Sequence, residues 1–217
     1  MSVDLIVYDL DGTLIDSART VLSIVNQMRS ELGRPPVDKS TLVPWISLGG
    51  IHLIAKSLEI DLSEAEKSLE EFRRRYLKYC HQETDLYPGI RETLDALTYS
   101  NKFLAICTNK PRNLVNKILA ELSLERYFEC VVAGGDLVNQ KPHPQNLLEC
   151  LNHFKCNSDS AILIGDSTVD QRMASFCRVP FAFFRPGYDD GVNRIQASVI
   201  LDAHIDLLSL NALHAYR

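Results

Sequence analysis

The chain has 217 residues, of which 46% are hydrophobic and 24% are charged, and its formal net charge is −5. This composition is typical of a globular protein that is long enough for a full core and a smaller second unit. The negative charge argues against nucleic-acid and anionic-membrane partners, and no apolar run approaches the roughly 20 residues of a membrane-spanning helix. The six cysteines are scattered without a Cys-x-x-Cys pair, and several lie in apolar runs, which predicts buried thiols in a cytoplasmic protein.

Short apolar runs alternate with segments of helical periodicity along most of the chain. Because the runs are continuous, they predict strands covered on both faces, in a Rossmann-like α/β core with a parallel sheet. The predicted strands are Leu5–Tyr8, Phe103–Cys107, Cys130–Ala133, Ala161–Ile164, Phe181–Phe184 and Val199–Leu201. The predicted helices between them are Ile90–Thr98, Leu114–Leu122, Pro144–His153 and Val169–Cys177.

One long interval, from about Ile15 to Asp85, has helical periodicity but no convincing strand. Its apolar residues recur at helical spacing in two groups, which are Val21, Ile24, Val25, Met28 and Leu32, and then Leu62, Ala65, Leu69, Phe72 and Tyr76. We therefore predict an all-helical cap domain over residues 15–85, inserted into a core domain of residues 1–14 and 86–217. An insertion after the first strand is expected above the carboxyl edge of the sheet.

Polar motifs follow four of the apolar runs. They are Asp9-x-Asp11-Gly12-Thr13, Thr108-Asn109-Lys110, Lys141-Pro142-His143-Pro144 and Gly165-Asp166-Ser167-x-x-Asp170. Ligands of open parallel sheets bind outside the carboxyl ends of the strands, so these motifs are predicted to meet at one site.

The residue types in these motifs suit phosphoryl transfer, which depends on positioning and charge neutralisation. Asp9 is the expected nucleophile, and Asp11 would protonate the leaving oxygen and later deprotonate water. The expected phosphate-binding residues are Gly12, Thr108, Asn109 and Lys141, with Gly49 and Gly50 in a cap loop that faces the site. Mg²⁺ is the expected cofactor, with carboxylate ligands drawn from Asp9, Asp11, Asp166 and Asp170.

Across nearly its whole length the chain resembles the haloacid dehalogenase superfamily of aspartate-nucleophile phosphotransferases. Asp9 and Asp11 look like the first motif of that superfamily, and Thr108 looks like the second. Lys141 looks like the third motif, and Asp166 with Asp170 looks like the fourth. The resemblance implies the family's core fold with a helical cap between the first and second motifs. Family dehalogenases lack an aspartate at the position of Asp11, so its presence favours phosphate chemistry.

Within the superfamily, the chain looks most like the phosphoglycolate phosphatase group. The similarity is carried by Gly49-Gly50, the Lys141–Pro144 run and Gly187-Tyr188-Asp189-Asp190-Gly191. The chain departs from the family at Cys177-Arg178, where Ala-Gly is frequent. The resemblance implies a Mg²⁺-dependent phosphatase that hydrolyses a small phosphorylated metabolite, 2-phosphoglycolate, through an aspartyl-phosphate, as a monomer or homodimer.

Two alternatives use the same fold. A phosphosugar mutase similar to β-phosphoglucomutase would return the phosphoryl group to its substrate and need a bisphosphate activator. A non-catalytic module that binds a phosphorylated ligand or regulates a partner would keep the fold without turnover.

Cationic side chains of the predicted cap are candidates for contact with substrate. Three successive helical residues cannot all face one site, so Arg73-Arg74-Arg75 is expected to be mostly a solvated face. His52 and Lys56 follow Gly49-Gly50 and are better placed to reach the cleft.

Overall fold

The computed structural model describes residues 3–46 and 49–213, and its centre is a parallel sheet in the order β3-β2-β1-β4-β5-β6. The predicted α/β fold and its strands are confirmed, and three strands extend further than predicted. The strands are β1 (Leu5–Tyr8), β2 (Phe103–Pro111), β3 (Cys130–Gly134), β4 (Ala161–Gly165), β5 (Phe181–Phe184) and β6 (Val199–Leu201).

Strand β1 lies between β2 and β4, and all of its residues are buried. Successive side chains of a strand point to opposite faces, so Ile6 and Tyr8 join one core cluster while Leu5 and Val7 join the other. Burial on both edges and both faces explains why this segment is apolar without alternation.

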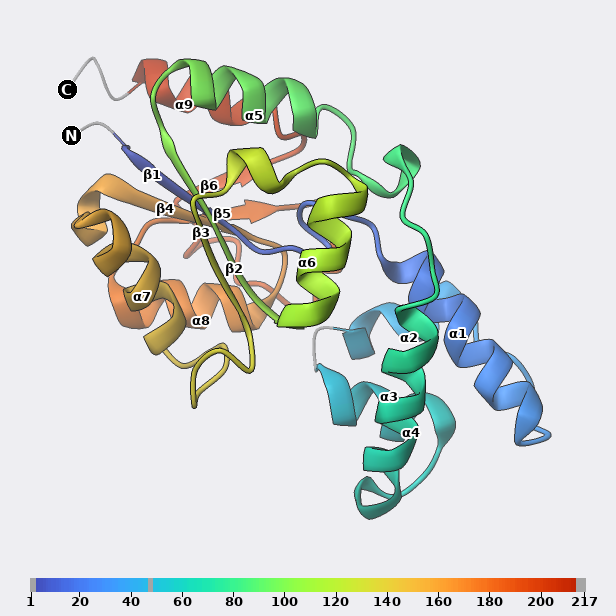
Figure 1. Ribbon diagram of the computed structural model, residues 1–217. Coiled ribbons are helices and arrows are strands. Elements are labelled where there is room, and N and C mark those ends of the chain that lie inside the picture. The colour runs from blue at the N-terminus through green and yellow to red at the C-terminus, as the bar shows by residue number, and fades with distance from the viewer. Residues whose placement is uncertain (1–2, 47–48, 214–217) are drawn as a thin grey trace.

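Helices cover both faces of the sheet (Figure 1). One face packs against α5 (Ile90–Tyr99), α6 (Arg112–Glu121) and α9 (Asp206–Leu213), and the other packs against α7 (Gln145–Phe154) and α8 (Thr168–Cys177). The four predicted core helices are thus confirmed, with ends that differ by at most two residues. Three short 3₁₀ helices join these elements, at Glu83–Asp85, Glu125–Tyr127 and Ser158–Ser160.

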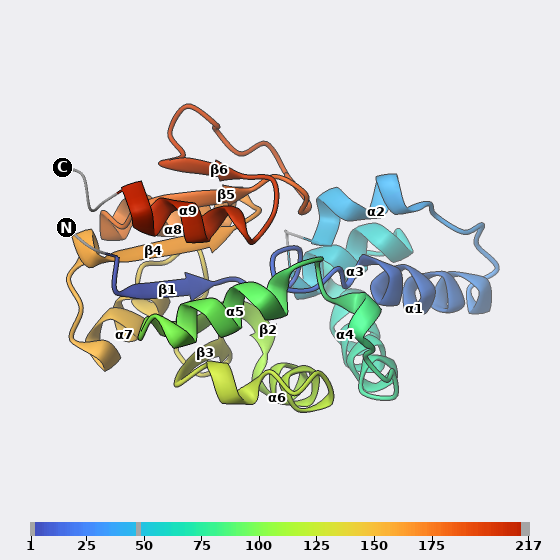
Figure 2. The ribbon, with the colours of Figure 1, turned by 90° about the horizontal axis from the view of Figure 1, so that it is seen from above.

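Four helices form a separate layer beyond the carboxyl ends of the strands (Figures 1 and 2). They are α1 (Ala18–Glu31), α2 (Lys39–Ile46), α3 (Gly50–Leu58) and α4 (Leu62–Tyr76). Their buried side chains include Val25, Leu42, Ile54, Leu58 and Phe72. Within 15–46 and 49–85 the structure has no strand, which confirms the all-helical insertion, hereafter the cap. No helix of the described ranges is both long and apolar enough to cross a membrane.

The chain enters and leaves the cap through two segments that lie side by side. The Asp16 amide donates to the Asp85 carbonyl at 2.8 Å, and the Tyr87 amide donates to the Leu14 carbonyl at 3.1 Å. An isolated antiparallel bridge joins Ile15 to Leu86 between these bonds. The domain boundaries at residues 14/15 and 85/86 stay a prediction.

The cysteines are free thiols, and the expectation that several are buried is confirmed for Cys107, Cys130, Cys150 and Cys177, while Cys156 is half-buried. Cys80 is exposed, because it lies in the loop that follows α4 rather than in an apolar run.

Tyr8 tests the cost of burying a polar group in this core. Its side chain is fully buried, and its hydroxyl has no hydrogen-bond partner among the described residues. We expect Tyr8→Phe to raise the free energy of unfolding by about 1 kcal/mol, because it removes an unsatisfied polar atom. The matched control is Tyr127→Phe, since the Tyr127 hydroxyl donates to Asp95 at 2.6 Å and should cost about 1 kcal/mol when lost. Urea denaturation of both variants measures the difference, and a destabilised Tyr8→Phe would contradict the expectation.

Candidate active site

A cavity of about 500 Å³ lies between the carboxyl edge of the sheet and the cap. All four polar motifs of the core contribute residues to the lining of this cavity, so they meet at one site as predicted. The residues on the core side include Asp9, Asp11, Thr108, Asn109, Lys141 and Asp166, and those on the cap side include Gly49, Gly50, His52, Arg73 and Tyr76.

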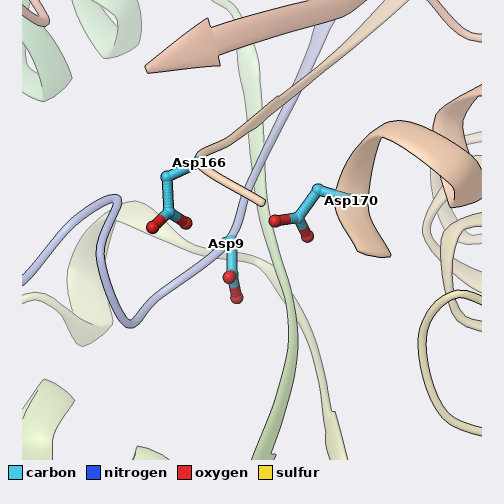
Figure 3. Close-up of side chains that lie close together, drawn as sticks. All are labelled: Asp9, Asp166 and Asp170. Carbon is cyan, nitrogen blue, oxygen red and sulfur yellow. The ribbon is translucent and has the colours of Figure 1, made fainter. Parts of the chain in front are cut away.

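Three carboxylates cluster at the core side of the cavity (Figure 3). Asp9 follows β1, Asp166 follows β4 and Asp170 lies in the first turn of α8. One oxygen from each side chain lies within 4.8 Å of one oxygen of each of the other two. The three residues are 7%, 1% and 0% exposed, so water screens their mutual repulsion poorly.

Lys141 is the cation in contact with this cluster. Its Nζ lies 2.8 Å from Asp9 Oδ1 and 2.7 Å from Asp170 Oδ1. Burial raises the pKa of Asp9 to about 6 against the lowering effect of Lys141, and the charge of Asp170 raises it further. Burial, and then the charges of Asp9 and Asp170, also hold the pKa of Asp166 well above its ordinary value. One lysine therefore offsets only part of the repulsion among three carboxylates.

The donor set of this cluster fits a hard divalent cation. Asp9 Oδ1 is buried and, despite its nearness to Lys141, receives no hydrogen bond of regular geometry from the described residues. Carboxylate oxygens are the ligands that Mg²⁺ prefers, and a bound cation would offset the repulsion that Lys141 leaves. The side chain of Asp11 lies outside this cluster, because Lys110 engages it, and its role as a metal ligand stays a prediction.

Backbone and side-chain donors orient Asp166. Thr13 Oγ1 donates to Oδ1 at 3.1 Å, and the amide of Tyr188 donates to Oδ2 at 2.7 Å. Two glycines allow this close packing, since a Cβ on Gly12 would overlap Asp166 Oδ2 and a Cβ on Gly187 would overlap Asp166 Cβ. Gly12 also has a φ of +81°, so it permits both the turn after β1 and the approach of Asp166.

Asn109 holds the backbone of Lys141. Its Oδ1 accepts from the Lys141 amide at 2.8 Å, and its Nδ2 donates to the Lys141 carbonyl at 3.1 Å. The clamp fixes the position from which Lys141 reaches Asp9. Thr108 is 2% exposed and also lines the cavity. The predicted contacts of Thr108 and Asn109 with phosphate stay predictions.

Lys110 joins the core to the cap, a role that the sequence analysis missed. Its Nζ donates to both oxygens of Asp11, at 2.9 and 3.0 Å, and to the hydroxyl of Tyr76 in α4 at 3.0 Å. Burial lowers the pKa of Lys110, but Asp11 and Tyr76 together more than offset this effect and raise the pKa above its ordinary value. Lys110 directly follows Thr108-Asn109, so its position in the sequence could have indicated that it lies at the site. Tyr76 gave no such indication, because it was assigned only to the apolar face of a helix.

Tyr188 and His204 also support the site and were not predicted to do so. The Tyr188 hydroxyl accepts from the Ala18 amide at 2.8 Å and donates to Asp16 at 3.1 Å. His204 is fully buried, and its Nε2 donates to the Thr13 carbonyl at 2.9 Å. Both side chains hold the loop that carries Asp11 and Thr13. Long-range contacts place both of them there. Tyr188 lies in the Gly187–Gly191 run that carried the resemblance, whereas no local sequence pattern singled out His204.

The cationic residues of the cap separate into two groups. Arg73 and His52 line the cavity, whereas Lys56 is exposed and is not part of the described lining. Arg74 is exposed, as expected of a solvated face, but Arg73 departs from that expectation because it faces the cavity.

Comparison with known proteins agrees with the fold and with the class of protein. A family model described as haloacid dehalogenase-like hydrolase matches residues 6–184. A phosphoglycolate phosphatase of Pseudomonas syringae is 34% identical over 194 residues, which cover 86% of this chain and 71% of the relative. A phosphoglycolate phosphatase of Cupriavidus necator is 32% identical over 204 residues, which cover 91% of this chain and 88% of the relative. The crystal structure of a predicted phosphoglycolate phosphatase from Haemophilus somnus has a TM-score of 0.85 at 26% identity and covers 95% of this chain and 97% of that one.

The chain belongs to the haloacid dehalogenase-like hydrolase family. Within that family it is similar to the phosphoglycolate phosphatase group, as its motifs and helical cap implied.

Metal binding to the carboxylate cluster should stabilise the folded protein. For a dissociation constant of about 1 mM, adding about 10 mM Mg²⁺ would contribute about 1.4 kcal/mol, or about 3–6 °C in Tm. Asp166→Asn should remove most of this shift, whereas Asp159→Asn, an exposed residue before β4, should retain it. Thermal melts with and without Mg²⁺ measure the shift, and an equal shift in Asp166→Asn would exclude this cluster as the binding site.

His204 should make the stability of the protein depend on pH. Burial lowers the pKa of His204 to about 4, and its Nδ1 has no partner among the described residues. Between about pH 6.5 and about pH 4 the unfolded chain binds a proton that the folded chain does not, so the free energy of unfolding falls as the pH falls. We expect a loss of about 2–3 kcal/mol from this residue across that window.

Urea denaturation at about pH 7.5 and about pH 4.5 tests this loss. The same pair of measurements on His204→Gln isolates the contribution of the histidine. An unchanged pH dependence in that variant would refute the role of His204.

Proposed function

We propose that the protein is a Mg²⁺-dependent phosphatase that hydrolyses a small phosphate monoester through an aspartyl-phosphate on Asp9. The observation that carries the proposal is the position of Asp9, which lines the cavity beside Lys141 and Asp166 at the carboxyl end of the central strand. The relatives named phosphoglycolate phosphatase support this reaction class.

The first step transfers the phosphoryl group to Asp9. A carboxylate oxygen of Asp9 attacks phosphorus, the bond between phosphorus and the ester oxygen breaks, and Asp11 donates a proton to the departing alcohol. Lys110 contacts both oxygens of Asp11, so this step requires one oxygen to turn from Lys110 toward the substrate. The Tyr76 hydroxyl then remains as a partner for the lysine.

The second step releases phosphate. Asp11 accepts a proton from a water molecule as the water oxygen attacks phosphorus, and the bond between phosphorus and Asp9 breaks. Inorganic phosphate leaves and Asp9 is regenerated as a carboxylate. The cap covers the cavity and limits access of bulk water while the intermediate exists.

Asp9, Asp166 and Asp170 are the residues that would hold Mg²⁺, which when bound supplies charge neutralisation for the phosphoryl oxygens. Lys141 supplies a second positive charge, and Asn109 fixes its backbone. Thr108 offers a hydroxyl on the same side of the cavity. Neutralising the phosphoryl oxygens allows an anionic nucleophile to approach an anionic ester.

The proposed substrate is 2-phosphoglycolate, on the similarity of the chain to enzymes of that name. Release of inorganic phosphate across a panel of phosphorylated metabolites, with Mg²⁺ and then with a chelator, tests the substrate. A phosphosugar mutase would release little phosphate without a bisphosphate activator, and a non-catalytic module would release none. Similar rates on many esters would refute a dedicated phosphoglycolate phosphatase.

Substitution of the two aspartates tests the mechanism. We expect Asp9→Asn and Asp11→Asn each to lower kcat by about 1,000-fold or more, because one lacks the nucleophile and the other lacks the proton carrier. Asp9→Asn should fold at least as stably as the wild type, since it removes one charge from the buried cluster. Asp159→Asn is the matched control. Near-normal, metal-dependent activity of either variant would overturn the mechanism.

A further inference from the structure

The arginines of α4 differ in their ion pairs. Arg74 pairs with Glu71 at 2.7 Å, and Arg75 pairs with Glu31 at 2.7 Å and with Glu71 at 2.6 Å. Arg73 forms no ion pair with any described residue.

Arg73 is half-buried in the wall of the cavity that contains Asp9. A Cβ built on Gly50 would lie 3.7 Å from Arg73 Nη2, so the guanidinium lies against the turn where α3 begins. The cap side of the cavity wall that Arg73 belongs to is mostly apolar and includes Ile51, Leu53, Leu69 and Phe72. A guanidinium that is partly removed from water beside apolar side chains, without an anion, favours an anionic ligand.

The other buried cations of the cavity already have anionic partners. Lys141 contacts Asp9 and Asp170, and Lys110 contacts Asp11. The phosphoryl group would lie beside Asp9 on the core side, whereas Arg73 lies on the cap side. Arg73 is therefore placed to meet a different part of the same substrate.

We propose that Arg73 determines specificity by binding a carboxylate of the substrate, so that phosphate esters of hydroxy acids are preferred over those of neutral alcohols. The inference rests on the proposed phosphatase function and adds the residue that selects this class of substrate. The planar fork of one guanidinium matches two oxygens of a carboxylate or of a phosphate, and a carboxylate is the second anionic group of the proposed substrate. A carboxylate remote from the reacting bond contributes mainly to binding, so Arg73 should affect KM more than kcat.

The test compares two esters of similar size, 2-phosphoglycolate and 2-hydroxyethyl phosphate, in which a hydroxymethyl group replaces the carboxylate. In Arg73→Met, which removes the charge and keeps an apolar stem, we expect the ratio of kcat/KM between the two esters to fall about 10- to 100-fold, mostly through KM. Arg73→Lys should restore part of the ratio. The matched control is Arg74→Met, which removes a charge from the next residue and should leave the ratio unchanged.

An equal loss on both esters, or an unchanged ratio, in Arg73→Met would overturn the inference while the phosphatase function stands. A larger loss on a diol bisphosphate than on 2-phosphoglycolate would also overturn it, because the bound group would then be a second phosphate. Wild-type protein that hydrolyses neither ester with Mg²⁺ would refute the proposed function instead.

Binding provides a readout without turnover. Calorimetric titration of 2-phosphoglycolate into Asp9→Asn should give an affinity that falls about 10- to 100-fold when Arg73→Met is added. An unchanged affinity would overturn the role of Arg73 whether or not the esters are hydrolysed.

Discussion

Three buried carboxylates within 4.8 Å of one another form the constraint around which the rest of the site is arranged. Burial removes the water that would screen Asp9, Asp166 and Asp170, so their ionised forms coexist only when positive charge is supplied nearby. Lys141 supplies part of it, through contacts of 2.8 and 2.7 Å. The remaining repulsion makes the cluster suited to a divalent cation and a phosphoryl group, and unsuited to a purely structural role.

The two layers of the molecule contribute different parts of the site. The carboxylates need fixed positions, which the carboxyl ends of β1 and β4 and the first turn of α8 provide. The cap contributes the opposite wall of the cavity and contacts the core through Tyr76, Lys110 and Asp11. In the proposed function the core residues carry the chemistry, and the proposed role of Arg73 gives the cap the choice of ester.

Most of the fold was predictable because its strands are buried on both faces. Four or five consecutive apolar residues, such as Leu5–Tyr8 and Ala161–Gly165, are a local signal that needs no tertiary information. The end of β2 was predicted too early because Thr108 is polar, yet pairing continues past an irregularity until Pro111 meets Gly134 of β3. Partner strands, rather than the polarity of the segment, decide where this strand ends.

The sequence by itself placed Asp9 and Asp166 at the site, because a polar residue directly after a buried parallel strand lies at the sheet edge where ligands bind. Thr108 lies within the last half of β2 and Lys141 follows β3 across a loop, so their motifs indicated the same edge less directly. Only the tertiary structure decided which other side chains reach that edge. Successive helical residues point about 100° apart, so Arg73, Arg74 and Arg75 face different surroundings that periodicity alone does not identify. Their neighbours decided the outcome, since Glu71 and Glu31 hold Arg74 and Arg75 on the outer surface while Arg73 faces the cavity.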